Sequence, residues 1–261
     1  MAKVIIYDKD GTLMKFDPFW VPVARHALNK IFSAVVKDVD LSEKLTEKVG
    51  LLAGVKDEKT NPGGILCSGT YSQLAEIVTG VLNSAGFEKI ITKSEVEEAM
   101  SDAVKYGETL PCRENLREKL LEARKVAKLF VVTTDEPVIT KICLEKLNVA
   151  DLFEKIYCDD GKFPHKPNPA AAYEVAGLTG ADKSEIYMVG DTATDCSFAI
   201  NAGINFISVG SCETIRGAAL YNAVDAVDAT DYILSQGEKK RVGNKKLVFT
   251  AKNEEFTGFT G

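Results

Sequence analysis

The sequence has few of the residues that build disulfide and metal–thiolate sites. Its 261 residues include 6 cysteines and 2 histidines. The cysteines are scattered along the chain, without the close pairs that are typical of zinc sites. We therefore interpret them as reduced thiols that mostly pack in the interior, as in a cytoplasmic protein.

Long apolar runs and an excess of positive charge are also missing. No stretch approaches the roughly 20 apolar residues of a membrane span, and the apolar run near the start is too short for a signal-peptide core. The formal net charge of −6 argues against nucleic acid as the main partner. We expect a cytoplasmic protein that binds neither a membrane nor nucleic acid.

The most informative stretch lies at the beginning of the chain. Residues 4–7 (Val-Ile-Ile-Tyr) are continuously apolar, which is typical of a strand buried on both faces of a parallel sheet. Asp8 and Asp10 follow this run, and Gly11 permits a sharp turn after them. Ligands of parallel sheets bind beyond the carboxyl ends of the strands. An Asp-Gly hairpin turn between two strands is the simpler alternative.

Residues 16–108 have the pattern of an all-helical block. The pair Asp17-Pro18 marks the start of a helix, and capping boxes begin at Thr70 and at Ser94. The block contains no strand signal. Helices are expected over residues 17–36, 42–53, 70–86 and 94–107.

From residue 109 onward, strands and helices alternate. This alternation predicts right-handed crossovers and a doubly wound parallel sheet with helices on both faces. We therefore predict an α/β core domain formed by residues 1–15 and 109–235, into which residues 16–108 are inserted as a helical domain. Residues 236–261 would form a C-terminal extension, either a hairpin or a tail. Strands are expected over residues 129–132, 155–158, 186–189, 204–209 and 223–227.

Four groups of polar residues follow separate predicted strands. Because the carboxyl ends of parallel strands meet at one edge, these groups should share one pocket. Several carboxylates that meet there would repel each other, which raises their pKa values or requires a cation. Oxygen ligands without histidine or cysteine favour Mg²⁺. The groups are Asp8 with Asp10, Thr133 with Thr134, Lys166, and Asp191 with Asp195.

In this order the groups resemble the four motifs of the haloacid dehalogenase (HAD) superfamily. Residues 8–12 (Asp-Lys-Asp-Gly-Thr) match the first motif, Thr133 the second, Lys166 the third, and residues 190–195 (Gly-Asp-Thr-Ala-Thr-Asp) the fourth. The helical block lies where the phosphoglycolate-phosphatase-like branch carries its C1-type cap. The resemblance implies a Rossmann-like core with an inserted helical cap. It also implies a Mg²⁺-dependent phosphatase that acts on a small phosphomonoester.

The resemblance assigns catalytic and metal-binding roles. Asp8 would attack phosphorus and form an aspartyl-phosphate intermediate, while Asp10 would act as general acid and then general base. Mg²⁺ would be bound by the carboxylates of Asp8 and Asp191 and the backbone carbonyl of Asp10. Asp195 would hold these ligands in position without binding the metal itself.

The phosphate-binding roles fall on Thr133, Thr134 and Lys166. After the second-motif threonine, phosphoglycolate phosphatases often continue with asparagine and lysine, whereas Thr134 is followed here by Asp135 and a glutamate. Asp135 is a natural N-cap for a helix that starts near Pro137. If Asp135 instead faces the pocket, it would disfavour a small dianionic substrate such as phosphoglycolate.

Other reactions stay open. Dehalogenases of the superfamily lack an acid at the position of Asp10, so halide displacement is not expected. A phosphomutase of the β-phosphoglucomutase type would share the same motifs. A phosphonatase would need a cap lysine, and nothing distinguishes Lys15, Lys30 or Lys37 for that role. A binding protein that uses the pocket without catalysis is a further alternative. We expect a small phosphorylated metabolite as partner, and the sequence does not indicate the oligomeric state.

Overall fold

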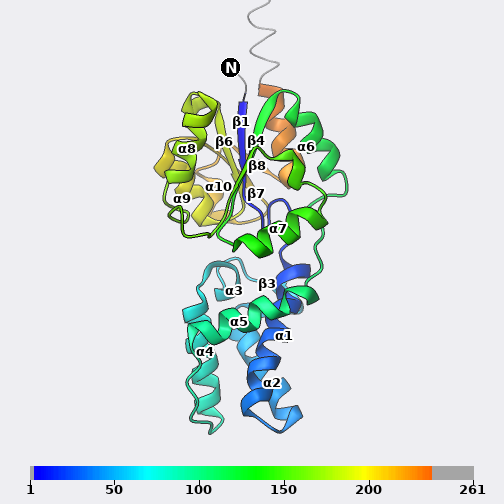
Figure 1. Cartoon of the computed structure of the whole chain (residues 1–261), viewed down its shortest axis with the longest axis vertical. Coiled ribbons are helices and arrows are strands. Elements are labelled where there is room, and N and C mark those ends of the chain that lie inside the picture. The colour runs from blue at the N-terminus through cyan, green and yellow to red at the C-terminus, as the bar shows by residue number, and fades with distance from the viewer. Residues whose placement is uncertain (1–2, 237–261) are drawn as a thin grey trace, which may run out of the picture.

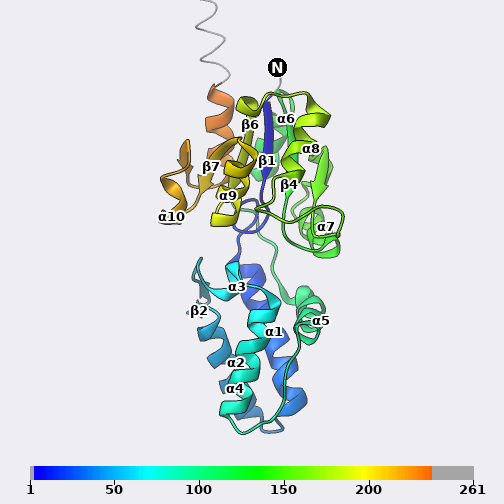
Figure 2. The same ribbon diagram turned by 90° about the vertical axis from the view of Figure 1, so that its left-hand side faces the viewer.

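The computed structural model describes residues 3–236. Two bodies lie one above the other along the long axis of the molecule (Figures 1 and 2). One is a sheet covered by helices on both faces, and the other consists mainly of helices. We call the second body, residues 16–108, the helical lobe.

The sheet has six parallel strands in the order β5-β4-β1-β6-β7-β8. Strand β1 lies between β4 and β6, with Val4 beside both Lys128 and Ile186. Since the first strand of the chain has later strands on both sides, the sheet is doubly wound, and the predicted α/β fold is confirmed. The strands are β1 (Lys3–Tyr7), β4 (Ala127–Val132), β5 (Lys155–Tyr157), β6 (Ile186–Gly190), β7 (Asn205–Val209) and β8 (Tyr221–Ala223).

Alternate side chains of β1 enter two separate apolar layers. Ile5 and Tyr7 pack with α6, α7 and a helix over residues 226–236, and Val4 and Ile6 pack with α8 and α9. All four side chains are almost completely buried, as expected for a strand with helices on both faces. The helices are α6 (Leu116–Arg124), α7 (Pro137–Lys146), α8 (Ala170–Thr179), α9 (Ala193–Ala202) and α10 (Glu213–Arg216), with 3₁₀ turns η2 (Ala150–Leu152) and η3 (Lys183–Glu185).

The helical lobe is built around α1, whose buried residues Phe19, Val23 and Phe32 face the other helices of the lobe. The prediction that residues 16–108 contain no strand is wrong. Strands β2 and β3 form a small antiparallel hairpin, with Asp57 and Glu58 in the left-handed region at its turn (φ +50° and +59°). The elements are α1 (Asp17–Val35), α2 (Val39–Leu52), β2 (Val55–Lys56), β3 (Lys59–Thr60), α3 (Ile65–Ser68), α4 (Tyr71–Ser84), α5 (Lys93–Ala103) and η1 (Val104–Tyr106).

Two helix starts in the lobe test the predicted capping boxes. The box at Thr70 is confirmed at the start of α4. The box predicted at Ser94 is wrong, because α5 begins two residues earlier with Thr92 as its N-cap and Glu95 as the reciprocal partner. Both residue pairs fit the same sequence pattern, so the pattern alone could not distinguish between them.

The predicted strand over residues 223–227 is also wrong in part. Strand β8 ends at Ala223, and a helix occupies residues 226–236. The Asp225 carboxylate accepts hydrogen bonds from the amides of Val227 (2.9 Å) and Asp228 (3.1 Å), which is the bonding of a helix start. The hairpin or tail predicted for residues 236–261 lies, apart from residue 236, outside the described residues.

Two chain segments join the bodies and lie side by side. The amide of Lys15 donates to the carbonyl of Leu110, and the amide of Cys112 donates to the carbonyl of Leu13, both at 2.9 Å. The predicted domain boundaries, at residues 15/16 and 108/109, fall at these segments and stay a prediction. Within residues 3–236 no helix combines the length and apolar character that crossing a membrane requires.

Candidate active site

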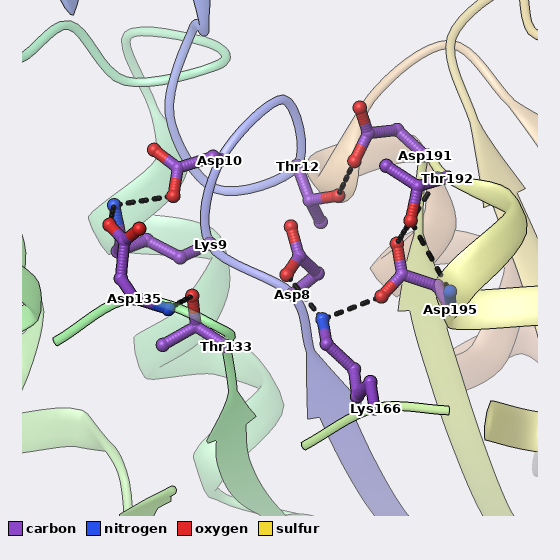
Figure 3. Close-up of polar contacts among 10 residues, drawn as sticks. All are labelled: Asp8, Lys9, Asp10, Thr12, Thr133, Asp135, Lys166, Asp191, Thr192 and Asp195. Carbon is purple, nitrogen blue, oxygen red and sulfur yellow. Dashed lines mark hydrogen bonds and ion pairs between the residues drawn. The ribbon is translucent and has the colours of Figure 1, made fainter. Parts of the chain in front are cut away.

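The centre of the site is a lysine between two carboxylates. Lys166 Nζ lies 2.6 Å from Asp8 Oδ1 and 2.6 Å from Asp195 Oδ1 (Figure 3). Asp8 follows β1, Asp195 lies in the first turn of α9, and Lys166 lies in the segment between β5 and α8. The fold thus brings residues from distant parts of the sequence to one sheet edge, as predicted from the strand ends.

Burial strongly affects the charges at this centre. It raises the pKa of Asp8 to about 7, with the Lys166 ammonium opposing the shift and the neighbouring carboxylates adding to it. Burial would lower the pKa of Lys166, but the carboxylates of Asp195 and Asp8 outweigh it and raise that pKa. The lysine therefore remains a cation at the centre of the acidic group.

A cluster of three acids can accommodate a metal ion. Asp8, Asp191 and Asp195 each offer a carboxylate oxygen, and these oxygens lie within 4.8 Å of one another. The pKa of Asp191 is raised well above its usual range by burial and by the charges of Asp8 and Asp195. A divalent cation would offset this accumulation of negative charge, and the all-oxygen donor set suits Mg²⁺. The residues therefore fit the predicted metal.

Both carboxylate oxygens of Asp195 accept hydrogen bonds from other residues. Its Oδ1 accepts from Lys166, and its Oδ2 accepts from the amide (3.1 Å) and the hydroxyl (2.6 Å) of Thr192. The Asp195 amide in turn donates to the Thr192 hydroxyl (3.3 Å), which completes a capping box at the start of α9. The start of this helix thus fixes the orientation of an acid that holds Lys166.

The turn after Asp10 depends on a glycine. Gly11 adopts φ +78°, and a Cβ atom at this position would lie 2.1 Å from Asp191 Oδ2. The adjacent Thr12 hydroxyl donates to Asp191 Oδ1 (3.1 Å). The first and fourth sequence motifs are therefore in direct contact, and only a residue without a side chain fits between them.

A second ionic cluster lies beside the first. Lys9 is completely buried, with Nζ 2.6 Å from Asp10 Oδ2 and 2.8 Å from Asp135 Oδ2. Trp20, in the helical lobe, donates from its indole Nε1 to Asp10 Oδ1 at 2.8 Å. The Asp10 carboxylate points toward Lys9, in a different direction from the Asp8 carboxylate (Figure 3). We call Lys9, Asp10 and Asp135 the Lys9 cluster.

The prediction that Asp135 is the N-cap of α7 is wrong. Glu136 occupies the N-cap position, and no side chain caps this helix start. Asp135 instead pairs with the buried Lys9. An unpaired buried ammonium is more unfavourable than a helix start without a side-chain cap, because water can still bind the amides of a partly exposed helix start. Burial and the charge of Asp10 raise the pKa of Asp135 to about 7, against the effect of Lys9.

The two threonines of the second motif differ in their surroundings. Thr133, at the end of β4, is buried, and its hydroxyl accepts a hydrogen bond from the amide of Asp135 (3.3 Å). Thr134 is exposed. Their phosphate-binding roles stay predictions, as do the roles of the other site residues.

The sequence reasoning missed Lys9 and Trp20. The position of Lys9 between two aspartates directly after a buried strand is a signal that a counter-ion is near, but lysines are mostly exposed, so the sequence did not indicate its burial. The Trp20 contact had no comparable signal, because it depends on how the helical lobe sits against the sheet.

A doubly wound parallel sheet with acids and a lysine at its carboxyl edge is an architecture found among α/β enzymes that act on phosphates. The family model described as haloacid dehalogenase-like hydrolase matches residues 2–203. The chain belongs to this family and is therefore an enzyme of the hydrolase class.

Several solved structures share the fold. A HAD-hydrolase from Bacillus subtilis bound to magnesium is 14% identical and has a TM-score of 0.62, with 89% of this chain and 98% of that one covered. A protein assigned as β-phosphoglucomutase in Thermotoga maritima is 16% identical (TM-score 0.61; 89% and 99% covered). A protein assigned as phosphoglycolate phosphatase in Haemophilus somnus is 19% identical and has a TM-score of 0.60, with 88% of this chain and 97% of that one covered. At these identities the similarity shows the fold alone, and no curated protein matches the sequence.

Proposed function

We propose that this protein is a Mg²⁺-dependent phosphatase that hydrolyses a small phosphomonoester through an aspartyl-phosphate on Asp8. The observation that carries the proposal is the Lys166 ammonium held 2.6 Å from Asp8 beside the three-acid cluster. A carboxylate nucleophile, a fixed cation for phosphoryl oxygens and a set of hard ligands then lie within one site. These are the components that phosphoryl transfer requires.

The metal ligands in this proposal are the carboxylates of Asp8 and Asp191 and the backbone carbonyl of Asp10. Asp195 supports them, since both of its oxygens are engaged by Lys166 and Thr192. When bound, Mg²⁺ reduces the repulsion between the carboxylate nucleophile and the phosphate dianion.

The reaction has two steps. Asp10 enters the first step protonated; a carboxylate oxygen of Asp8 attacks phosphorus, the bond from phosphorus to the ester oxygen breaks, and Asp10 gives that oxygen its proton. Water then attacks the phosphorus of the aspartyl-phosphate, Asp10 accepts a proton from the water, and inorganic phosphate leaves with Asp8 restored. Lys166 stabilises the phosphoryl oxygens as charge shifts among them, with Thr133 and Thr134 as further donors.

The test is hydrolysis of p-nitrophenyl phosphate and of a panel of phosphorylated metabolites, with released phosphate as the readout. Asp8→Asn should abolish Mg²⁺-dependent turnover while the circular dichroism spectrum stays unchanged. Asp160→Asn, which removes an exposed acid that pairs with Lys162, is the matched control and should retain activity. Undiminished turnover by Asp8→Asn would refute the mechanism.

Product analysis separates the alternatives. An isomerised sugar phosphate with little free phosphate would replace the proposal by a phosphomutase, a name carried by one of the structural neighbours. No turnover of any phosphate ester despite Mg²⁺ binding would refute the proposed phosphatase activity.

A further inference from the structure

We propose that Lys9 and Asp135 are positioning residues for Asp10. In this proposal Lys9 holds the Asp10 carboxylate away from the nucleophile, and Asp135 keeps Lys9 paired when Asp10 turns toward the leaving group. The inference rests on the proposed function, because it takes Asp10 as the residue that transfers the proton.

The first observation is the environment of the Lys9 ammonium. The side chain is completely buried, and its Nζ lies 5.8 Å from the ring centroid of Phe19, 5.9 Å from that of Trp20 and 3.8 Å from Met14 Sδ. Such surroundings cannot replace water around a cation, so Lys9 needs a carboxylate partner at all times.

The second observation is that Asp10 is held from both bodies of the molecule. Its Oδ2 pairs with Lys9 of the sheet body (2.6 Å), and its Oδ1 accepts from Trp20 of the helical lobe (2.8 Å). In this conformation the carboxylate does not point toward Asp8 (Figure 3). To protonate the leaving oxygen of an ester whose phosphorus is attacked by Asp8, Asp10 must therefore release Lys9.

The third observation makes that release feasible. Asp135 Oδ2 lies 2.8 Å from Lys9 Nζ, so Lys9 retains one counter-ion after Asp10 departs. Without Asp135, turning Asp10 would leave a buried ammonium unpaired, which is strongly unfavourable. Asp135 thereby lowers the free energy needed to bring Asp10 into the reacting position.

The test compares two aryl esters by kcat/KM, which reports formation of the aspartyl-phosphate. p-Nitrophenyl phosphate has a leaving group that needs no proton, whereas phenyl phosphate has one that does. In Asp135→Asn, we expect kcat/KM for phenyl phosphate to fall roughly tenfold or more and that for p-nitrophenyl phosphate to fall less than about threefold. Glu136→Gln, which removes the adjacent exposed acid, should leave the ratio of the two values unchanged.

The double variant Lys9→Met/Asp135→Asn tests the positioning role directly. Methionine fills the apolar space around Lys9 and carries no charge that would hold Asp10 away from the nucleophile. The ratio of kcat/KM for phenyl phosphate to that for p-nitrophenyl phosphate should therefore return to within about threefold of wild type. A structural role alone would lower both values together and make the double variant worse than the single one.

Two results would overturn the inference: an unchanged ratio in Asp135→Asn, or a double variant whose ratio is as low as that of the single one. Thermal unfolding of each variant identifies losses that come from misfolding, since these affect both esters equally. The proposed function fails separately, if Asp8→Asn still hydrolyses p-nitrophenyl phosphate.

Discussion

The indole Nε1 of Trp20 donates a 2.8 Å hydrogen bond to Oδ1 of Asp10. Trp20 belongs to the first turns of α1, and Asp10 belongs to the loop after β1. A side chain of the helical lobe thus contacts the acid to which we assign proton transfer. The position of the lobe and the orientation of this acid are therefore coupled.

Replacing Trp20 by phenylalanine should reveal this coupling. The variant keeps an aromatic ring but removes the donor, so we expect the free energy of unfolding to fall by about 1 kcal/mol. Because Asp10 is then held in its non-reacting orientation by Lys9 alone, kcat/KM should rise by roughly fivefold. Denaturant unfolding and steady-state kinetics measure the two effects. Tyr221→Phe removes a hydrogen bond to Asp228 at the far strand of the sheet and should leave kcat/KM at the wild-type value. Equal kinetics in the two variants would contradict the coupling.

Replacing Lys166 by methionine should destabilise the fold as well as abolish activity. The change leaves Asp8 and Asp195 buried without their cation, and breaking such a buried pair costs about 3–5 kcal/mol. Urea denaturation measures this loss. Lys162→Met removes an exposed lysine that pairs with Asp160 and should change stability by less than about 1 kcal/mol. A Lys166→Met protein as stable as Lys162→Met would show that the buried pair contributes nothing.

The stability of the metal-free protein should fall as pH rises. The pKa of Asp8 is raised from 3.8 to about 7, so the folded state binds this proton more tightly than the unfolded state does. The stabilising contribution is complete below the unfolded pKa and is lost as pH rises through the folded value. Since Mg²⁺ competes with protons for the same carboxylates, its stabilising effect should increase with pH.

Scanning calorimetry at pH 5.5 and pH 8, with and without Mg²⁺, checks this prediction. The rise in Tm on adding Mg²⁺ should be larger at pH 8. In Asp8→Asn the pH dependence of that rise should become weaker. A larger rise at pH 5.5 in the wild-type protein would contradict the assignment.

Replacing Gly11 by alanine should disrupt the contact between the first and fourth motifs. The new Cβ would lie 2.1 Å from Asp191 Oδ2, so this carboxylate must move, and we expect kcat/KM to fall by roughly 100-fold or more. Gly210→Ala is a matched control, because Gly210 has nearly the same backbone angle (φ +74°) but no atom within 4 Å of the added methyl group. Similar kinetics in both variants would indicate backbone strain as the only cause.

Much of the sheet body could be predicted from the sequence, since its signals are local. Continuous apolar runs identify β1, β4 and β6, and the polar residues after them identify the site edge. The prediction failed where two local patterns competed. Thr92 and Ser94 both begin a capping box, and the apolar residues after Ala223 suit a strand or a buried helix equally well.

The sequence could predict only those site residues whose position is set by the end of the strand that they follow. Asp8, Lys166 and Asp191 meet because they follow strands of one parallel sheet. The orientation of Asp10 and the partner of Asp135 depend instead on the buried Lys9. Competition between a helix end and a buried ammonium is decided by three-dimensional packing, which the local sequence does not contain.

The central position of β1 also has a consequence for the order in which the chain acquires structure during synthesis. Strand β1 leaves the ribosome well before its two neighbours in the sheet, which begin only at Ala127 and Ile186. The helices between residues 17 and 103 can pack on one another long before either neighbour is translated. Nascent chains should therefore present a folded helical lobe and an unpaired first strand. The acids of the site can come together only after α9 has been made.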